Sequence, residues 1–159
     1  MELFLIRHAE STNNIRKNES DRVADPELTQ RGLLQRDHLM NFFKKGLHLT
    51  NTERESGGKV LDHLYCSAMQ RALQTTQPIA QSIELKPEVW VEIHEVGGLY
   101  DVNSVDGSKF FCSGLKREEI NSGFPGYILP PEVTDQGWWN RDAETMREAH
   151  LRVKQVVKQ

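Results

Sequence analysis

The stretch Leu3-Phe4-Leu5-Ile6-Arg7-His8-Ala9-Glu10-Ser11 places a short apolar run directly before an arginine and a histidine. A continuous apolar run of this kind is typical of a strand covered on both faces in a parallel α/β sheet. Ligands of such sheets bind beyond the carboxyl ends of the strands, which is where Arg7 and His8 fall. A neutral imidazole can attack phosphorus, and a guanidinium can hold two phosphate oxygens. The stretch therefore offers a candidate nucleophile beside a candidate anion-binding group.

An isolated Arg-His pair favours a plainer interpretation, a structural histidine at a strand end beside a surface charge. Three further stretches reverse that preference because they follow the first one in a fixed order. They are Leu28-Thr29-Gln30-Arg31-Gly32-Leu33-Leu34-Gln35, Ser67-Ala68-Met69-Gln70-Arg71-Ala72-Leu73-Gln74-Thr75, and Glu95 followed by Gly97-Gly98-Leu99. In addition, Asn14 lies six residues after His8.

This ordered set resembles the signature of the histidine phosphatase superfamily, the phosphoglycerate mutase-like proteins. The usual forms in that family are Arg-His-Gly-Glu-Ser, then Leu-Thr-x-x-Gly-x-x-Gln, then Ser-x-x-x-Arg-Ala-x-x-Thr, and a glutamate ahead of a glycine pair. Ala9 in place of the first glycine is a mild departure. The resemblance covers about the first hundred residues. It implies an α/β fold, a three-layer sandwich with a mostly parallel sheet flanked by helices.

The resemblance also implies roles for particular residues. It makes His8 the nucleophile of a phosphohistidine intermediate and Glu95 the group that acts first as acid and then as base, with Glu92 as the runner-up. Phosphate is expected to bind to Arg7, Asn14 and Arg71, with Ser11 as a possible further contact. No metal and no cofactor are needed, since the arginines supply the positive charge.

The expected reaction is hydrolysis of a small phosphorylated substrate or a phosphoprotein by a metal-independent phosphomonoesterase. A phosphomutase is an alternative, because a substrate hydroxyl can replace water as the final acceptor. Members of the family also carry a second His-Gly after a later strand, and nothing in this chain matches it. The chain therefore resembles the N-terminal portion of a histidine phosphatase, incomplete at its C-terminus, and a non-catalytic protein that binds phosphate or a phosphorylated ligand is a further alternative.

Length and composition set broader limits. The 159 residues suit a single domain over 1–159, with a loop-rich insertion at about 101–137 where glycines and prolines break every long periodicity. The net charge of −3 gives no global reason to expect nucleic acid or a membrane as partner. The two cysteines, Cys66 and Cys112, lie far apart and predict free thiols in the cytoplasm. The sequence leaves the oligomeric state open.

The remaining patterns predict an alternation of strands and helices. Strands are expected over 60–66 and 89–93 in addition to the N-terminal run, and helices after Thr29, after Ser67, over 116–121 and from about Asp142. In this arrangement Arg71 and Glu95 each follow a strand, so both are expected near the sheet edge that carries His8.

Overall fold

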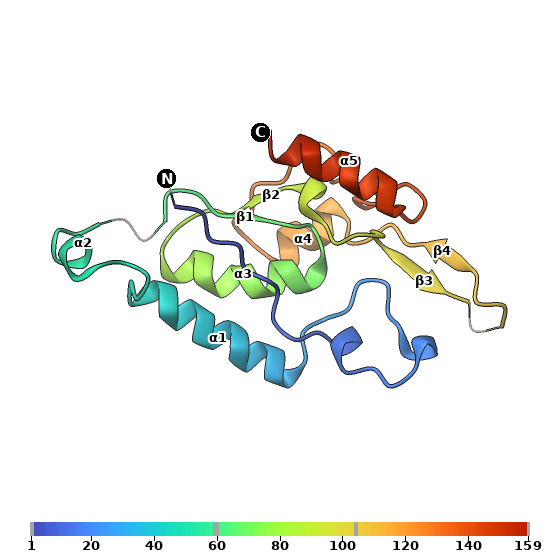
Figure 1. Ribbon diagram of the computed structural model, residues 1–159, viewed down its shortest axis with the longest axis horizontal. Helices are drawn as coiled ribbons and strands as arrows, with labels where there is room; N and C mark the ends of the chain where they lie inside the picture. The colour runs from blue at the N-terminus through green and yellow to red at the C-terminus, as the bar shows by residue number, and fades with distance from the viewer. Residues whose placement is uncertain (1, 59–60, 104, 159) are drawn as a thin grey trace.

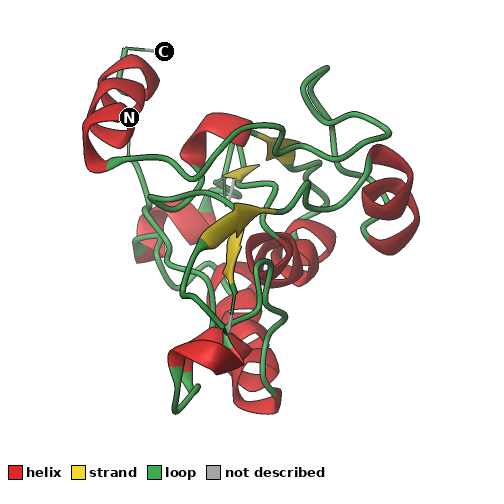
Figure 2. Ribbon diagram, turned by 90° about the vertical axis from the view of Figure 1, so that its right-hand side faces the viewer, coloured by secondary structure: helices red, strands yellow, loops and turns green. Residues whose placement is uncertain are grey.

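The computed structural model describes residues 2–58, 61–103 and 105–158. It has a mixed α/β architecture, as predicted from the sequence, with short strands among longer helices and loops (Figure 2). The helices are α1 (Gln30–Lys44), α2 (Asn51–Glu55), α3 (Gln70–Ser82), α4 (Arg117–Gly123) and α5 (Met146–Val156), with 3-10 turns η1 (Thr12–Asn14), η2 (Glu19–Asp21) and η3 (Val91–Ile93). The strands are β1 (Tyr65–Cys66), β2 (Glu88–Val89), β3 (Tyr100–Val102) and β4 (Lys109–Phe111).

Helices begin where the sequence supplies a cap. The Thr29 side chain accepts a hydrogen bond from Gly32 N at the start of α1, and Thr145 does the same for Glu148 N at the start of α5. In α3 the first helical residue is Gln70, and the Ser67 hydroxyl accepts from Met69 N just ahead of it. Helix α3 runs on through Pro78 and packs along α1 (Figure 1).

Strands β1 and β2 pair in parallel, and α3 lies between them in the sequence. Tyr65 is opposite Glu88, and Cys66 is opposite Val89. They form a strand-helix-strand unit whose helix carries Arg71 near its N-terminus. The expected strand over 60–66 shrinks to β1, and Val60 lies outside the described residues. The expected strand over 89–93 ends at Val89, because the chain turns into η3. Strands β3 and β4 form a separate antiparallel hairpin.

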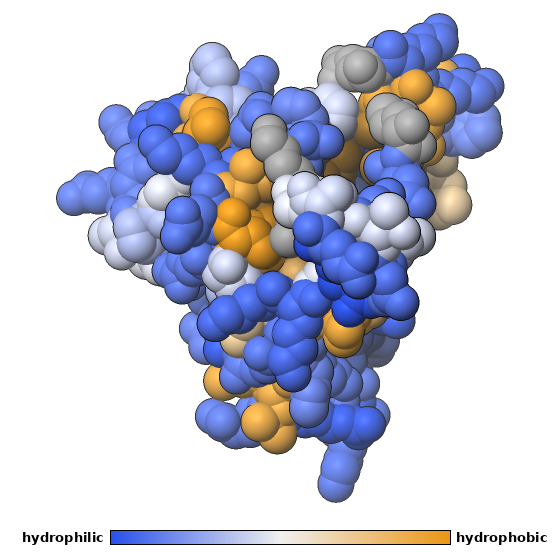
Figure 3. Space-filling model, turned by 90° about the vertical axis from the view of Figure 1, so that its left-hand side faces the viewer, coloured by the Kyte–Doolittle hydropathy of each residue, from blue (hydrophilic) through white to orange (hydrophobic). Residues whose placement is uncertain are grey.

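The prediction of a buried strand at the N-terminus is wrong for this structure. Residues 3–6 have no strand assignment, and the side chains of Leu3 and Leu5 are 73% and 88% exposed. On the face shown in Figure 3, several apolar patches lie among the polar residues. The physical reason is that no described residue pairs with this backbone in a ladder, so the run has no neighbouring strand to cover it. Phe4 makes edge-to-face contacts with Phe43 at the end of α1 and with His48.

The core lies between α3, the strand pair β1–β2 and the later part of the chain. Its fully buried members include Leu73, Leu99, Ile120, Val133 and Trp139. Ile120 and Val133 belong to the segment expected as an insertion, so that segment contributes to the core as well as to the surface. In the part of the chain that the structure describes, no helix is both long enough and apolar enough to cross a membrane.

Candidate functional site

A small polar cavity of about 80 Å³ lies where four segments meet. They are the chain around His8, the loop from η1 to Pro26, the start of α3, and the turn after η3. The lining residues are His8, Ser11, Asn13, Asn14, Arg16, Arg22, Ala24, Pro26, Arg71, Glu95 and Gly98. The cavity therefore gathers most of the predicted site residues from distant parts of the sequence.

His8 presents a free ring nitrogen at this cavity. Its Nδ1 lies 2.7 Å from the carbonyl oxygen of Ala9, which can only accept, so Nδ1 carries the proton and Nε2 keeps its lone pair in the neutral ring. Burial, followed by the positive charges of Arg71 and Arg7, holds the pKa of His8 below its usual value of 6.5, although the bond to Ala9 acts in the opposite direction. The neutral form needed for nucleophilic attack is thus favoured at neutral pH.

The segment around His8 is fastened to the two main helices. Ala9 N donates to Thr75 Oγ1 in α3 at 3.1 Å, and Thr29 N donates to Glu10 O at 2.9 Å. Gly32 is required for this approach, since a Cβ at that position would lie 2.0 Å from Glu10 O. These contacts explain why the threonines and the glycine occur at fixed places in the motifs.

Arg71 is buried at the base of the cavity, 5% exposed, and its Nη2 donates to Glu95 Oε2 at 2.5 Å. Behind it, Asp25 Oδ1 accepts from Gln70 N at 2.9 Å and lies 4.0 Å from Arg71 Nη1. Burial raises the pKa of Asp25 to about 6, against the lowering influence of the Gln70 bond and of Arg71. Asp25 therefore caps the N-terminus of α3 and places a carboxyl group beside Arg71.

Glu95 reaches the cavity with a side chain that is 69% exposed, so it combines contact to Arg71 with access to solvent. Glu92 does not line the cavity: its carboxylate lies 3.8 Å from Arg141 Nη2. Of the two candidates for acid and base, the structure therefore brings Glu95 to His8 and leaves Glu92 apart from it.

Ser11 and Asn14 lie together on the cavity wall. The amide oxygen Oδ1 of Asn14 accepts from Ser11 N at 2.8 Å and from Ser11 Oγ at 3.0 Å. This arrangement uses the acceptor side of Asn14 and leaves its NH₂ group available as a donor to an anion. Ser11 itself is 1% exposed, so its role in the structure is to hold Asn14.

Arg7 is exposed and does not line the cavity, although its charge acts on His8. In its place the structure contributes two arginines that the sequence analysis did not single out, Arg16 and Arg22. Arg16 is paired with Glu19 at 2.7 Å, and the guanidinium of Arg22 stacks on the ring of Tyr100 at 4.0 Å. The sequence signal for these two residues was their basic character in a polar loop that has no helical or strand periodicity.

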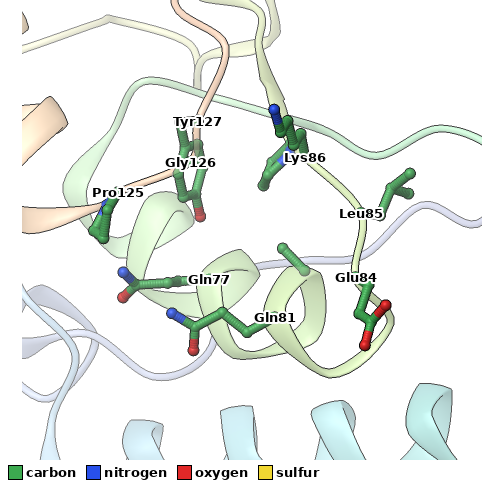
Figure 4. A pocket seen from close by; sticks show the side chains of 10 residues that line it. Gln77, Gln81, Glu84, Leu85, Lys86, Pro125, Gly126 and Tyr127 are labelled. Atoms are coloured by element: carbon green, nitrogen blue, oxygen red, sulfur yellow. The ribbon is translucent and has the colours of Figure 1, made fainter.

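A larger cavity of about 180 Å³ lies between the end of α3 and the turn at Pro125 to Tyr127 (Figure 4). Its wall is mostly apolar, with Glu84 and Lys86 among the lining residues, and it contains no histidine or arginine. Among the residues that the structure describes, no group of three or more His, Cys, Asp or Glu side chains could hold a metal ion. The His8 cavity is therefore the candidate site.

A family model described as the histidine phosphatase superfamily (branch 1) matches residues 3–159. The chain belongs to this superfamily. No curated protein gives a match.

The fold has counterparts among solved structures. The ecdysone phosphate phosphatase of Bombix mori in complex with tungstate has a TM-score of 0.51 at 15% identity, over 95% of this chain and 64% of that one. A mycobacterial glucosyl-3-phosphoglycerate phosphatase in complex with VO3 has a TM-score of 0.49 at 15% identity, over 95% and 60%. The chain thus spans less than two thirds of the length of these superfamily structures. The first likeness supports the phosphoglycerate mutase-like fold.

Proposed function

We propose that this chain carries the phosphoryl-transfer site of a metal-independent phosphomonoesterase that works through a phosphohistidine at His8. The observation that carries the proposal is the neutral His8 ring, with Nε2 free, in one cavity with buried Arg71 and accessible Glu95. This cavity combines a nucleophile, a cation for the phosphoryl oxygens and a carboxyl group for proton transfer.

In the first step Nε2 of His8 attacks phosphorus, the N–P bond forms and the bond to the leaving oxygen breaks. Arg71 and the NH₂ group of Asn14 stabilise the charge on the phosphoryl oxygens, and Arg7 adds positive potential from outside the cavity. An incoming phosphate competes with Glu95 for Arg71, because the two now form an ion pair. Once displaced, the Glu95 carboxylate takes up a proton from solvent and gives it to the leaving oxygen.

In the second step the Glu95 carboxylate takes a proton from water, the water oxygen attacks phosphorus, and the N–P bond breaks. Inorganic phosphate leaves, His8 returns to its neutral form, and Glu95 releases its proton to solvent when it pairs with Arg71 again. The same residue serves as acid and then as base, as reversal of the reaction requires. Transfer to a substrate hydroxyl instead of water gives a mutase with the same intermediate.

A second candidate function is phosphate or phospho-ligand binding without turnover. It is supported by the lining of the cavity, in which His8 is the single histidine among the described residues. Incubation with a small phosphoryl donor separates the two candidates. The enzyme should acquire an acid-labile, base-stable phosphoryl group that His8→Ala abolishes and that His150→Ala, an exposed histidine on α5, retains. Phosphate binding with no such adduct would favour the non-catalytic function.

The pH dependence of adduct formation is a further check. Because the pKa of His8 is lowered, its neutral form persists below pH 6.5, and the rate should hold constant into that range before it falls. A rate that already declines at pH values above 6.5 because of His8 protonation would contradict the burial of the ring.

A further inference from the structure

A buried ion pair lies behind the segment that presents Glu95. Arg152 of α5 donates from Nε to Glu144 Oε1 and from Nη2 to Glu144 Oε2, both at 2.7 Å, so the ion pair is bidentate. The two side chains are 8% and 6% exposed. Neither residue lines the His8 cavity, so the pair is outside the site described above.

Both members of the pair also hold the backbone of the segment 92–97. Nη1 of Arg152 donates to the carbonyl oxygen of Glu92 at 2.7 Å, and Glu144 N donates to the carbonyl oxygen of Gly97 at 3.1 Å. Figure 1 shows α5 lying over the part of the chain that leads from β2 into β3. The two ends of the segment that carries Glu95 are thus tied to one ion pair.

Between these ends the segment is also held by the buried His94, whose ring packs edge-to-face on Trp139 and whose Nε2 lies 3.3 Å from Arg141 Nη2. Glu95 O accepts from Gly98 N at 3.1 Å and lies 2.8 Å from Nδ1 of His94, while the Glu95 side chain is mostly exposed. A 3-10 turn and a glycine pair flank it, and neither is a long regular element that would fix its position. The direction in which Glu95 points therefore depends on its ion pair with Arg71, on the packing of His94 and on how both ends of the segment are held.

We propose that the Arg152–Glu144 pair positions Glu95 for proton transfer, so that Arg152 is a positioning residue of the site although it contacts no reacting group. The inference rests on the proposed function, in which Glu95 is the acid and base. A displacement of about 1 Å in such a group lowers the rate by about a hundredfold. Breaking a buried pair also leaves an unpaired charge, which affects the fold, so the test must separate the two effects.

Phosphate esters with different leaving groups distinguish a loss of proton donation by Glu95 from a general effect on the fold. A dinitrophenyl phosphate needs little help from an acid, whereas an alkyl phosphate depends on proton donation. Arg152→Lys keeps the charge and loses the bidentate geometry. It should lower kcat/KM, which reports only the steps up to phosphorylation of His8, about ten- to a hundredfold for the alkyl ester and less than about threefold for the dinitrophenyl ester. Glu95→Gln should show the same dependence on the leaving group.

Arg117→Gln is the matched control. Arg117 also fixes backbone through two side-chain hydrogen bonds, to Val133 O at 2.8 Å and to Pro130 O at 2.5 Å, and these bonds hold the segment 130–133 instead of the segment 92–97. It should affect both esters equally. The double variant Glu144→Leu/Arg152→Leu removes both buried charges together. Its activity should still fall more for the alkyl ester than for the dinitrophenyl ester. Equal losses for both esters in the Arg152 variants would overturn the proposal and leave a purely structural pair.

A measurement without turnover keeps this inference distinct from the proposed function. The carboxyl carbon of Glu95, observed by NMR, should change its chemical shift in Arg152→Lys and keep it in Arg117→Gln. If the wild-type protein hydrolyses neither ester, the proposed function fails, while the NMR result still decides whether the pair positions Glu95. An unchanged Glu95 signal in Arg152→Lys would overturn the inference on its own.

Discussion

His8 and Arg71 line the same cavity, but the segments that carry them are held in the fold in opposite ways. The helix α3 that carries Arg71 buries Leu73 completely and Ile79 to 2% exposure, and it connects two paired strands. The run ahead of His8 is more apolar, yet Leu5 is 88% exposed. The comparison teaches that an apolar run is buried only where backbone partners and covering side chains are present.

Two leucine substitutions test this comparison most strongly. Leu73→Ala removes a side chain with no exposed surface and should lower the free energy of unfolding by about 2–5 kcal/mol. Leu5→Ala should change it by no more than about 0.5 kcal/mol, since the side chain is already in water. Chemical denaturation of both variants measures the two values. A large loss in Leu5→Ala would show that the N-terminal run is covered in solution.

Asp25→Asn sharpens the comparison on the α3 side, through pH. Because the pKa of Asp25 rises from 3.8 to about 6 in the folded state, the folded protein binds more protons than the unfolded one between these values. Wild-type stability therefore falls as pH rises through this window, by up to about 3 kcal/mol. Asp25→Asn should lack that fall, and so gain stability relative to the wild type between pH 4 and pH 7.

Denaturation curves at the two pH values measure this gain, and Asp135→Asn, at an exposed position, serves as the control. The control should follow the wild-type pH dependence. Parallel behaviour of Asp25→Asn and the wild type would mean that Asp25 is ionised and solvated in the folded protein.

The two arginines give the smallest expected difference. Arg71→Gln removes a buried cation from the cavity and should weaken the binding of inorganic phosphate about ten- to a hundredfold. Arg7→Gln removes an exposed cation outside the lining and should weaken it no more than about fivefold. Calorimetric titration compares them. Equal losses would show that Arg7 turns into the cavity when phosphate binds, and that the two segments act alike.

Much of the site could be predicted from sequence because its determinants are local. The motifs fix Thr29 as a helix cap, Gly32 against Glu10, and Arg71 at the start of a helix that follows a strand. Each of these needs only a few neighbouring residues. The expectation that Arg71 and Glu95 would lie near His8 followed from strand and helix order, and that for Ser11 and Asn14 followed from the family resemblance. All five residues line one cavity. Their catalytic roles stay predictions.

Other features depended on contacts between residues far apart in the chain. Whether Leu3 to Ile6 forms a strand depends on a partner for its backbone, and the composition of the run contains no information about that partner. The entry of Arg16 and Arg22 into the cavity depends on the path of an aperiodic loop.

The sequence by itself determined the superfamily, the α/β class and the chemical groups that are candidates for phosphoryl transfer, because these follow from short motifs and their order. Only the tertiary structure decided which glutamate meets Arg71, how the Arg152–Glu144 pair holds the segment that presents Glu95, and which apolar residues stay in water. The physical reason is that burial and charge pairing are properties of neighbours in space, and a single strand, loop or arginine does not specify its neighbours.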